Sequence, residues 1–196
     1  MRDRLASLPW VLLASTVALA GCGGSSSGSA SSTPSPSATS DAKSAATGDI
    51  PDNQAFLTFR DPVGYSLVYP EGWARRGAGA DVTFQDKANV IHIVVTRGSA
   101  PTPGSVRSAL QGLARTDPTV AAGTPKLLAL GHGPAVKVSY TRRGGPDPVT
   151  GKRPTLIVDR YVFGHAGRVA TVDLETAKGV DNVDAYKMIS RSFTWR

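Results

Sequence analysis

The stretch FRDPVGYSLVYPEGW, residues 59–73, decides the fold of this chain. A strand-like segment, Phe56–Arg60, runs into it, and the proline and glycine of Asp61–Gly64 are placed as in a turn. A second strand-like segment, Tyr65–Tyr69, follows and stops at a proline. Two short strands joined by a tight turn form a β-hairpin. The stretch therefore predicts that the folded part opens with a hairpin, and that Glu71–Trp73 turns the chain sharply out of it.

Downstream of this hairpin, strand-like segments and turns alternate. The segment Asn89–Thr96 is almost continuously apolar, which is typical of a strand that is covered on both faces. Short glycine-containing turns separate most of the later segments, so we expect an antiparallel meander. The strand-like segments after residue 73 are Ala80–Gln85, Asn89–Thr96, Pro125–Leu130, Ala135–Arg142, Pro154–Phe163 and Arg168–Leu174.

Two segments have the residue spacing of amphipathic helices. In Pro103–Arg115 the apolar residues fall on one face, and Thr102 is placed as an N-cap. In Val183–Ser192 the apolar residues recur every three or four positions, and Asp181 or Asn182 can cap the helix. Strands outnumber helices and meet in hairpins. The sequence therefore predicts an α+β fold, an antiparallel sheet with helices packed on it.

Two stretches resemble PsbP/Mog1-like domains. Residues 59–73 are similar to the opening of that family, where a hairpin with a Gly-Tyr or Gly-Phe turn leads to Pro-x-x-Trp. The ending, from Tyr186 through SRSFTW at residues 190–195, is similar to the family's last helix and Ser-Phe tail. The resemblance covers roughly residues 52–196 and implies an α/β/α sandwich, in which a central antiparallel sheet lies between helices.

The resemblance implies no enzymatic activity. The photosystem member of the family is an accessory subunit and the nuclear-transport member binds a small GTPase, so the family's known uses lie in protein binding. Many actinobacterial lipoproteins of unassigned function share this domain, and the Ala, Gly, Arg and Val bias of the chain suits a high-GC genome. We therefore expect a non-catalytic binding or accessory module.

The N-terminus has the three parts of a secretory signal peptide over residues 1–21: a charged start, an apolar run, and small residues before a cleavage point. The sequence Leu19-Ala20-Gly21-Cys22 resembles the bacterial lipobox. That resemblance implies that the Cys22 thiol takes a diacylglycerol and that its freed amine can be acylated, with chains such as palmitate. Two or three acyl chains hold a protein persistently on a membrane. The expected location is the extracytoplasmic face of a bacterial cell membrane.

The segment after the lipobox is almost wholly Gly, Ser, Ala, Thr and Pro. Such a segment cannot bury enough apolar surface to offset the entropy lost on ordering, so it predicts a disordered linker. The expected organisation is a signal peptide over residues 1–21, the lipidated cysteine and linker over residues 22–50, and a single globular domain over residues 51–196.

The chain is basic, with 22 Lys and Arg against 15 Asp and Glu, a formal net charge of +7 at pH 7. Cleavage after residue 21 removes two arginines and one aspartate and leaves a formal charge of +6. Basic chains include nucleic-acid binders, but an exported chain without an aromatic-rich basic motif is not expected to be one. We expect attraction to anionic lipid headgroups or anionic wall polymers instead.

Residues for cofactor or metal chemistry are scarce. Cys22 is the only cysteine, so once it carries lipid the chain has no disulfide, thiol nucleophile or cysteine-based metal site. The histidines His92, His132 and His165 lack a second His, Cys or acidic residue at a metal-ligand spacing. No Gly-x-Ser-x-Gly motif lies on a predicted strand-to-helix turn. We therefore expect no catalytic residue, metal or cofactor.

An alternative hypothesis is an envelope hydrolase that uses carboxylates of the sheet, because glycosidases act through a pair of carboxyl groups. Asp159 and Asp173 lie in strands of the same predicted hairpin, but Arg160 and Arg168 are close in sequence, which favours ordinary salt bridges. A further hypothesis is a small molecule bound between sheet and helix. The candidate carboxylates are Asp81, Asp86, Asp159 and Asp173.

A ten-residue loop, Arg143–Lys152, is flanked by positive charge. Adjacent antiparallel strands should bring the bases before the loop close to those after it, and loops on a rigid scaffold often carry function. These residues form the candidate contact for an envelope protein or an anionic polymer, with a merely solvated rim as the alternative. We call them the basic hairpin end; its members are Arg142, Arg143, Lys152 and Arg153.

Overall fold

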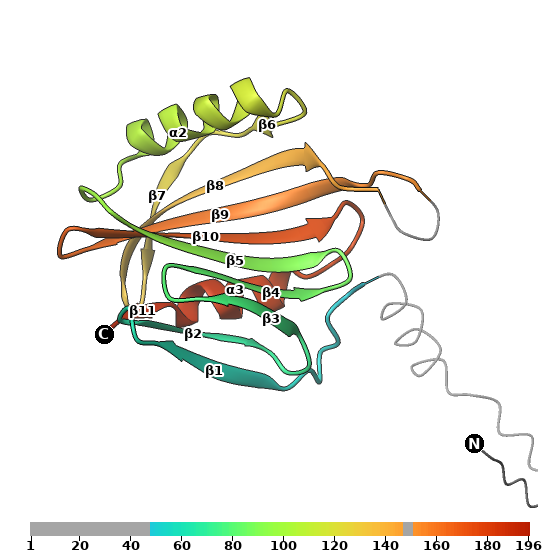
Figure 1. The fold of residues 1–196 in the computed structure, drawn as a ribbon, viewed down its shortest axis with the longest axis horizontal. Helices are drawn as coiled ribbons and strands as arrows, with labels where there is room; N and C mark the ends of the chain where they lie inside the picture. Colours follow the sequence, from blue (N-terminus) through green and yellow to red (C-terminus); the bar gives the residue numbers. More distant parts are fainter. Residues whose placement is uncertain (1–47, 147–150) are drawn as a thin grey trace, which may run out of the picture. The chain divides into compact units, whose positions relative to one another are not determined.

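The computed structural model describes residues 48–146 and 151–196. Its centre is an eight-stranded antiparallel sheet (Figure 1). The main path has the order β3-β4-β5-β10-β9-β8-β6, and β7 also pairs with β8. The strands are β3 (Ala74–Ala78), β4 (Asp81–Asp86), β5 (Asn89–Arg97), β6 (Ala121–Ala122), β7 (Lys126–Leu130), β8 (Gly133–Arg143), β9 (Thr155–His165) and β10 (Arg168–Ala177).

The predicted opening hairpin is confirmed, but it belongs to a second, three-stranded sheet. β1 (Phe56–Asp61) pairs with β2 (Tyr65–Pro70), and β2 also pairs with β11 (Thr194–Trp195) near the C-terminus. Gly64 has a φ of +100° in the turn, a conformation that glycine adopts without strain. The buried Asp61 fixes the same turn, because its carboxylate accepts the backbone N–H groups of Val63 at 2.8 Å and Gly79 at 3.1 Å.

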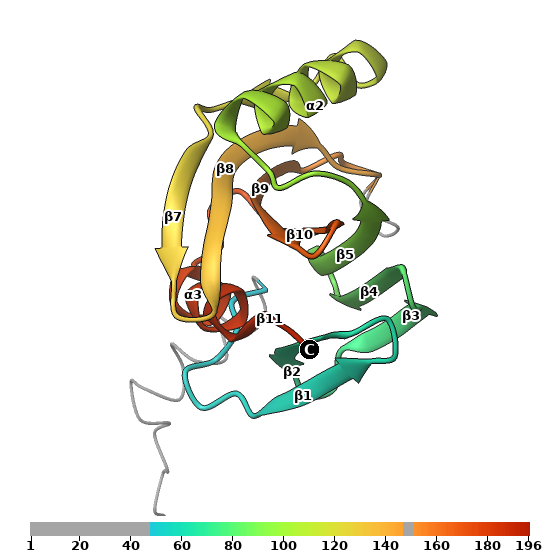
Figure 2. The same cartoon turned by 90° about the vertical axis from the view of Figure 1, so that its left-hand side faces the viewer.

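The two predicted helices cover opposite faces of the large sheet (Figure 2), which confirms the α+β class and the layered arrangement. α2 (Pro103–Thr116) buries Val106 and Leu110 over β8 and β9. α3 (Val183–Ser192) buries Tyr186 and Ile189 on the other face, where they join the core shared with the small sheet. Trp73 is buried in the same core.

The predicted N-cap of α2 is present. The Thr102 hydroxyl accepts the backbone N–H of Ser105 at 3.1 Å, and the Ser105 hydroxyl accepts the Thr102 N–H at 3.0 Å. This reciprocal capping box satisfies two donors at the start of the helix.

The start of α3 differs from the simple cap that the sequence predicts. Asn182 holds the N-cap position, but its side chain makes no capping hydrogen bond. Its Oδ1 instead accepts the N–H of Ile50 at 2.7 Å, and its Nδ2 donates to Asn89 at 3.0 Å. Asn89 also donates to the carbonyl of Gly48 at 2.5 Å. The buried amides therefore tie the incoming chain to β5 and to the last helix.

The prediction that residues 89–96 are covered on both faces is wrong. β5 is central, since it pairs with β4 and β10, and its Ile91, Ile93 and Val95 are buried in the core on the α3 face. Its other face, with Val90 and Val94, is only half-buried. The reason is that α2 packs over β8 and β9 and leaves the β5 part of that face open.

Three strands have no counterpart in the sequence prediction. β3 is exposed at every residue, so it has no apolar face to mark it, and it is recruited by pairing with β4. β6 and β11 have two residues each, too few for a periodic pattern. These short elements form by tertiary pairing rather than by local preference.

Candidate functional site

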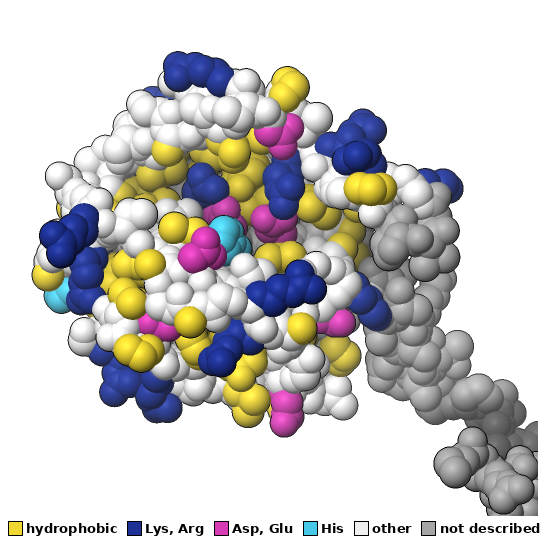
Figure 3. Space-filling model, in the orientation of Figure 1, with side chains coloured by type: hydrophobic (Ala, Val, Ile, Leu, Met, Phe, Trp, Pro, Cys, Tyr) yellow, Lys and Arg dark blue, Asp and Glu magenta, His cyan; other side chains and the backbone are white. Residues whose placement is uncertain are grey.

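The open part of the α2 face forms a hollow in the surface. In Figure 3 apolar side chains floor the hollow beneath α2, and basic, acidic and histidine side chains meet at its centre. Strand register explains this gathering, because residues directly opposite each other in an antiparallel sheet project from the same face. One such row crosses the sheet through Val138, Arg160, Asp173, His92 and Thr83. Charged residues from distant parts of the chain are thereby aligned.

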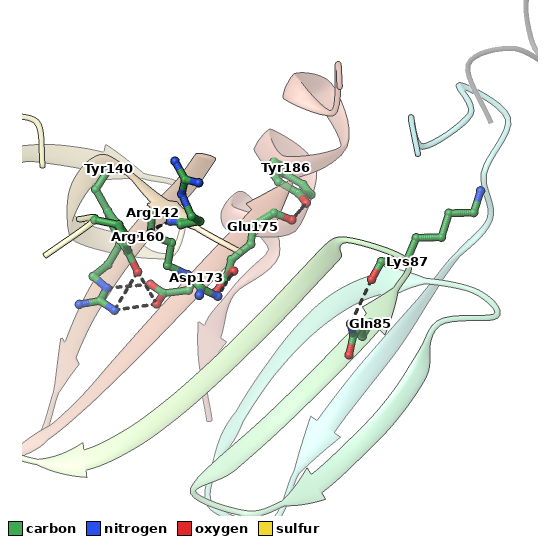
Figure 4. Close-up of polar contacts among 10 residues, drawn as sticks. Gln85, Lys87, Tyr140, Arg142, Arg160, Asp173, Glu175 and Tyr186 are labelled. Carbon is green, nitrogen blue, oxygen red and sulfur yellow. Dashed lines mark hydrogen bonds and ion pairs between the residues drawn. The ribbon is translucent and has the colours of Figure 1, made fainter. Parts of the chain in front are cut away.

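The centre of the row is an ion pair between Arg160 and Asp173 (Figure 4). Arg160 Nε donates to Asp173 Oδ1 at 2.7 Å and Nη2 donates to Oδ2 at 2.6 Å, so the pairing is bidentate. The Tyr140 hydroxyl donates to Asp173 Oδ2 at 3.2 Å, and the Tyr140 ring lies 5.3 Å from the guanidinium carbon. The side chains of Arg160 and Asp173 are only 17% and 8% exposed. This is a buried charge pair with additional hydrogen bonds, the arrangement that compensates best for lost solvation.

A second ion pair lies beside the first. Arg142 Nη2 lies 2.5 Å from Glu175 Oε2, and Glu175 is two residues beyond Asp173 on the same face of β10. The Glu175 carboxylate is 8% exposed. Across the sheet its own backbone carbonyl accepts the Tyr186 hydroxyl of α3 (Figure 4). We call Tyr140, Arg142, Arg160, Asp173 and Glu175 the charged network.

Electrostatics within the charged network favour the ionised pair and the neutral phenol. Burial lowers the pKa of Arg160, but the hydrogen bonds and the charge of Asp173 outweigh burial and raise it. Burial raises the pKa of Tyr140, and the negative charge of Asp173 raises it further. Tyr140 is therefore a hydrogen-bond donor to the carboxylate rather than an acid or base near neutral pH.

The row continues to a third contact at its solvent side. His92 Nε2 lies 2.9 Å from Asp81 Oδ1, so within the described chain His92 is a hydrogen-bonded histidine of the sheet rather than a metal ligand. Both side chains are more exposed than the charged network, at 36% for His92 and 71% for Asp81. His132 lies in the exposed turn between β7 and β8, and the exposed His165 is the last residue of β9. Among the described residues no group of three or more His, Cys, Asp or Glu could hold a metal ion.

The four candidate carboxylates are not brought together. Asp173 faces the hollow, whereas Asp159, opposite Leu174 in the register, projects from the α3 face. There Asp159 Oδ2 lies 2.8 Å from Lys137 Nζ. Asp81 contacts His92, and Asp86 lies at the exposed β4–β5 turn. Asp159 and Asp173, the carboxylates of one predicted hairpin, therefore do not share a face of this sheet.

The structure separates the four residues of the basic hairpin end into two groups. Arg142 turns onto the sheet to pair with Glu175, whereas Arg143 is exposed and its backbone N–H donates to the Thr119 hydroxyl at 3.0 Å. Arg153 Nη1 reaches the carbonyl of Gly144 at 3.4 Å, and Lys152 is exposed. Residues 147–150 of this loop lie outside the described residues.

Two small pockets adjoin these elements. One, of about 150 Å³, lies between α3 and the sheet, with Ile157, Leu174 and Val180 in its lining and the Lys137–Asp159 pair at its side. The other, of about 220 Å³, lies between the start of α2 and the sheet and is lined in part by Arg160. The first pocket is the space between sheet and helix that the small-molecule hypothesis requires.

The signal peptide, Cys22 and most of the linker lie outside the described residues. No helix in the part of the chain that the structure describes is long and apolar enough to cross a membrane.

Comparison with known proteins identifies the fold. The structure is similar to the solution structure of cyanobacterial PsbP (CyanoP) from Synechocystis sp. PCC 6803, with a TM-score of 0.52, 14% sequence identity, and coverage of 76% of this chain and 98% of that one. A looser likeness is to LpqN, involved in cell envelope biogenesis of Mycobacterium tuberculosis, with a TM-score of 0.43, 17% identity, and coverage of 73% and 91%. No protein-family model and no curated protein matches the sequence.

The likeness to CyanoP defines the class of the chain as an α+β protein with a PsbP-like fold, the class that the sequence predicts. At 14% identity the likeness concerns the fold and carries no activity, because one fold can support many functions.

Sequence reasoning missed the charged network as a unit. Tyr140 and Glu175 were not among its candidates, although Asp173 and Glu175 two residues apart put two acids on one face of an apolar strand. That pattern signals a polar row on the sheet. The arginines that neutralise it come from β8 and β9, and only the register shows which of them is opposite which acid.

Proposed function

We propose that the chain is a lipid-anchored, non-catalytic binding module on the extracytoplasmic face of a bacterial cell membrane. Its partner is negatively charged, an envelope protein or an anionic polymer. The observation that supports this most is the pairing of Asp173 and Glu175, the buried acids of the hollow, with Arg160 and Arg142. A carboxylate acting as general base or nucleophile must reach a substrate. Here both acids are paired with arginines of the sheet, and positive charge remains on the surface of the protein.

The anchor is tested through Cys22. We expect the parent protein to fractionate with the membrane and to yield an N-terminal peptide heavier by the diacylglycerol and acyl chains. Cys22→Ser should appear in the soluble fraction or in the medium. Membrane attachment of Cys22→Ser equal to that of the parent would refute the lipid anchor.

The contact is tested by removing exposed charge without touching the charged network. In Arg143→Gln/Lys152→Gln/Arg153→Gln, Arg142 and its partner Glu175 stay intact. The matched control is Arg107→Gln/Arg115→Gln/Arg191→Gln, which removes the same charge from exposed helix positions.

If the basic hairpin end is the contact, in-cell crosslinks to an envelope partner, or retention on an anionic polymer, should fall about tenfold in the loop variant. The same signals should change little in the helix variant. Equal losses in both variants would mean that net charge, not this loop, governs attachment. No crosslink and no retention for the parent would refute the binding proposal.

The pocket between α3 and the sheet supports a second candidate function, small-molecule binding. Its volume of about 150 Å³ suits a ligand of the size of a benzene ring. Native mass spectrometry of the purified protein should then show a retained ligand, and Val180→Trp should displace it. A spectrum of bare protein alone would count against this function.

A further inference from the structure

Three basic side chains form a row at the end of the large sheet that lies away from the basic hairpin end. His165 of β9 is directly opposite Arg168 of β10, which is directly opposite Arg97 of β5. Directly opposite residues project from one face with their Cβ atoms about 5 Å apart. The two-residue turn Ala166–Gly167 fixes the first pairing. We call His165, Arg168 and Arg97 the basic row.

Trp195 holds two members of the row in place. The Arg168 guanidinium carbon lies 4.8 Å from the centre of the indole ring, and the His165 ring stacks on the indole with a centroid distance of 6.1 Å. Arg168 Nη1 also donates to the carbonyl of Val63. Arg168 is half-buried in this position, while Arg97 and His165 are exposed. Since a held guanidinium loses less side-chain entropy when a ligand binds, the row is partly preorganised.

The basic row has no acidic partner among the residues that the structure describes. None of the ion pairs there involves Arg97, Arg168 or His165. Asp61, the acid of the turn that Arg168 contacts, is buried and accepts the backbone N–H groups of Val63 and Gly79. Like charges directly opposite each other in a sheet are destabilising. An anion between Arg97 and Arg168 would remove that repulsion.

A separate observation at the same place concerns a donor. The Trp195 Nε1–H is buried and no described residue accepts its hydrogen. Buried polar groups almost always have a partner, and exceptions call for an explanation. This donor belongs to the same indole ring that contacts Arg168 and His165.

We propose that the basic row is a binding site for phosphate groups. Guanidinium groups recognise phosphate through paired N–H donors, and arginine carries five such donors. Arg168 donates one to Val63, and Arg97 makes no hydrogen bond within the described chain beyond the ladder of the sheet. Two guanidinium groups and an imidazole on one face can donate together to the non-bridging oxygens of a phosphate group.

The position of the row indicates the source of the phosphate. The chain enters the domain where Asn89, the first residue of β5, bonds Gly48, and Arg97 is the last residue of that nine-residue strand (Figure 1). At about 3.3 Å per residue the two ends are roughly 26 Å apart. The row therefore lies far from the point where the segment from Cys22 enters. This favours a phosphate-bearing polymer in the surroundings over the headgroups beneath the chain.

The test is calorimetric titration of the intact protein with inorganic phosphate, with a soluble phosphodiester polymer, and with vesicles containing phosphatidylglycerol, at constant ionic strength set by chloride. Phosphate should bind, and the polymer should bind more tightly through repeated contacts. Arg97→Gln should weaken both at least tenfold and His165→Ala severalfold. Arg107→Gln, an exposed arginine of α2, is the matched control and should bind like the parent.

Several outcomes are decisive. Parent protein that binds neither phosphate, polymer nor vesicles overturns the site, as does binding that Arg97→Gln leaves unchanged. Binding to vesicles that depends on Arg97, together with weak binding of the polymer, keeps the phosphate site and assigns it to lipid headgroups. Arg97→Gln is preferred to Arg168→Gln because Arg168 also packs on Trp195. The row and the basic hairpin end occupy opposite ends of β9, so each can fail separately.

Discussion

Asp159 and Asp173 belong to adjacent strands of one hairpin, yet their side chains lie on opposite faces of the sheet. In the register Asp159 is opposite Leu174 and Asp173 is opposite Arg160. Asp173 is held by Arg160 in the hollow beneath α2, whereas Asp159 is held by Lys137 on the α3 face. The two carboxylates therefore cannot act on one bond, although they are close in the hairpin.

Asp173→Asn should destabilise the fold strongly. It leaves the mostly buried Arg160 charge without its partner, and breaking a buried pair from one side costs about 3 kcal/mol or more. Asp159→Asn should cost roughly 1 kcal/mol or less, because Lys137 and Asp159 are 34% and 24% exposed and water screens them. Urea unfolding followed by circular dichroism measures both changes.

The double variant provides the control for this pair. Since the carboxylates contact different partners on different faces, the two free-energy losses should add within about 0.5 kcal/mol. A larger coupling would mean that the two faces of the sheet communicate. A smaller loss for Asp173→Asn than for Asp159→Asn would contradict the burial argument.

Gly164→Ala should destabilise the domain by about 1–3 kcal/mol. A Cβ at Gly164 would lie 2.5 Å from Pro101 Cδ and 3.1 Å from Ala100 Cα, so the segment before α2 would have to move. The matched variant is Gly112→Ala within α2, where a Cβ meets nothing within 4 Å. That change should raise stability by about 0.5–1 kcal/mol through helix preference. Thermal unfolding of both variants measures the two changes. A gain in stability for Gly164→Ala, or a loss for Gly112→Ala, would contradict this prediction.

Ala166→Gly should stabilise the protein. Ala166 has a φ of +47° in the turn between β9 and β10, where Gly167 has +74°, and a left-handed conformation costs a non-glycine residue about 1 kcal/mol. The gain should raise the melting temperature by about 2–4 °C for a domain of this size. Ala166→Val is the counterpart and should lower the melting temperature. Calorimetric scans that show no change for either variant would argue against this turn geometry.

Alkaline pH should unfold the protein through its buried tyrosines. Burial is the main cause that raises the pKa of Tyr65, Tyr140 and Tyr186 above the ordinary value of about 10. Because the folded-state pKa lies above the unfolded one, the stabilising contribution is complete below pH about 10 and is lost as the pH rises toward the folded pKa. The loss is up to about 1.4 kcal/mol per pH unit for each tyrosine.

Tyr140→Phe isolates one of these contributions. It should lower stability at neutral pH by about 1 kcal/mol, because the hydrogen bond to Asp173 is lost, and make the decline above pH 10 shallower by about a third. Denaturant unfolding at pH 8, 10 and 11 measures both effects. An unchanged slope would show that Tyr140 ionises in the folded protein as readily as in the unfolded chain.

Most of the fold follows from local sequence patterns, as residues 59–73 and the two amphipathic helices show. The patterns predict which side chains of a strand share a face, but they do not predict which element packs on that face. Val90 and Val94 look like core residues, yet α2 ends up over β8 and β9 and leaves them half-exposed. The exposed strand β3 has no pattern at all and forms only because β4 offers it a partner.

The site was less predictable than the fold, because it depends on register. Asp173 was a candidate from the sequence, but its partner Arg160 pointed only to salt bridging in general. A shift of the strand register by one residue moves every side chain to the other face of the sheet. Such a shift would therefore change which acid each arginine contacts. For the same reason Arg142 was counted among the candidate contacts of the basic hairpin end, although it pairs with Glu175 on the sheet.

The small sheet joins the beginning of the domain to its end. The backbone N–H of Val68 in β2 donates to the hydroxyl of Ser192 at 2.8 Å, across 124 residues of chain, and β11 pairs with the same strand. Contacts of such long range form late and slow folding. A polypeptide that emerges N-terminus first can close this sheet only when its last helix has followed. In the export that we propose, translocation would therefore deliver an open chain, and folding would finish after release.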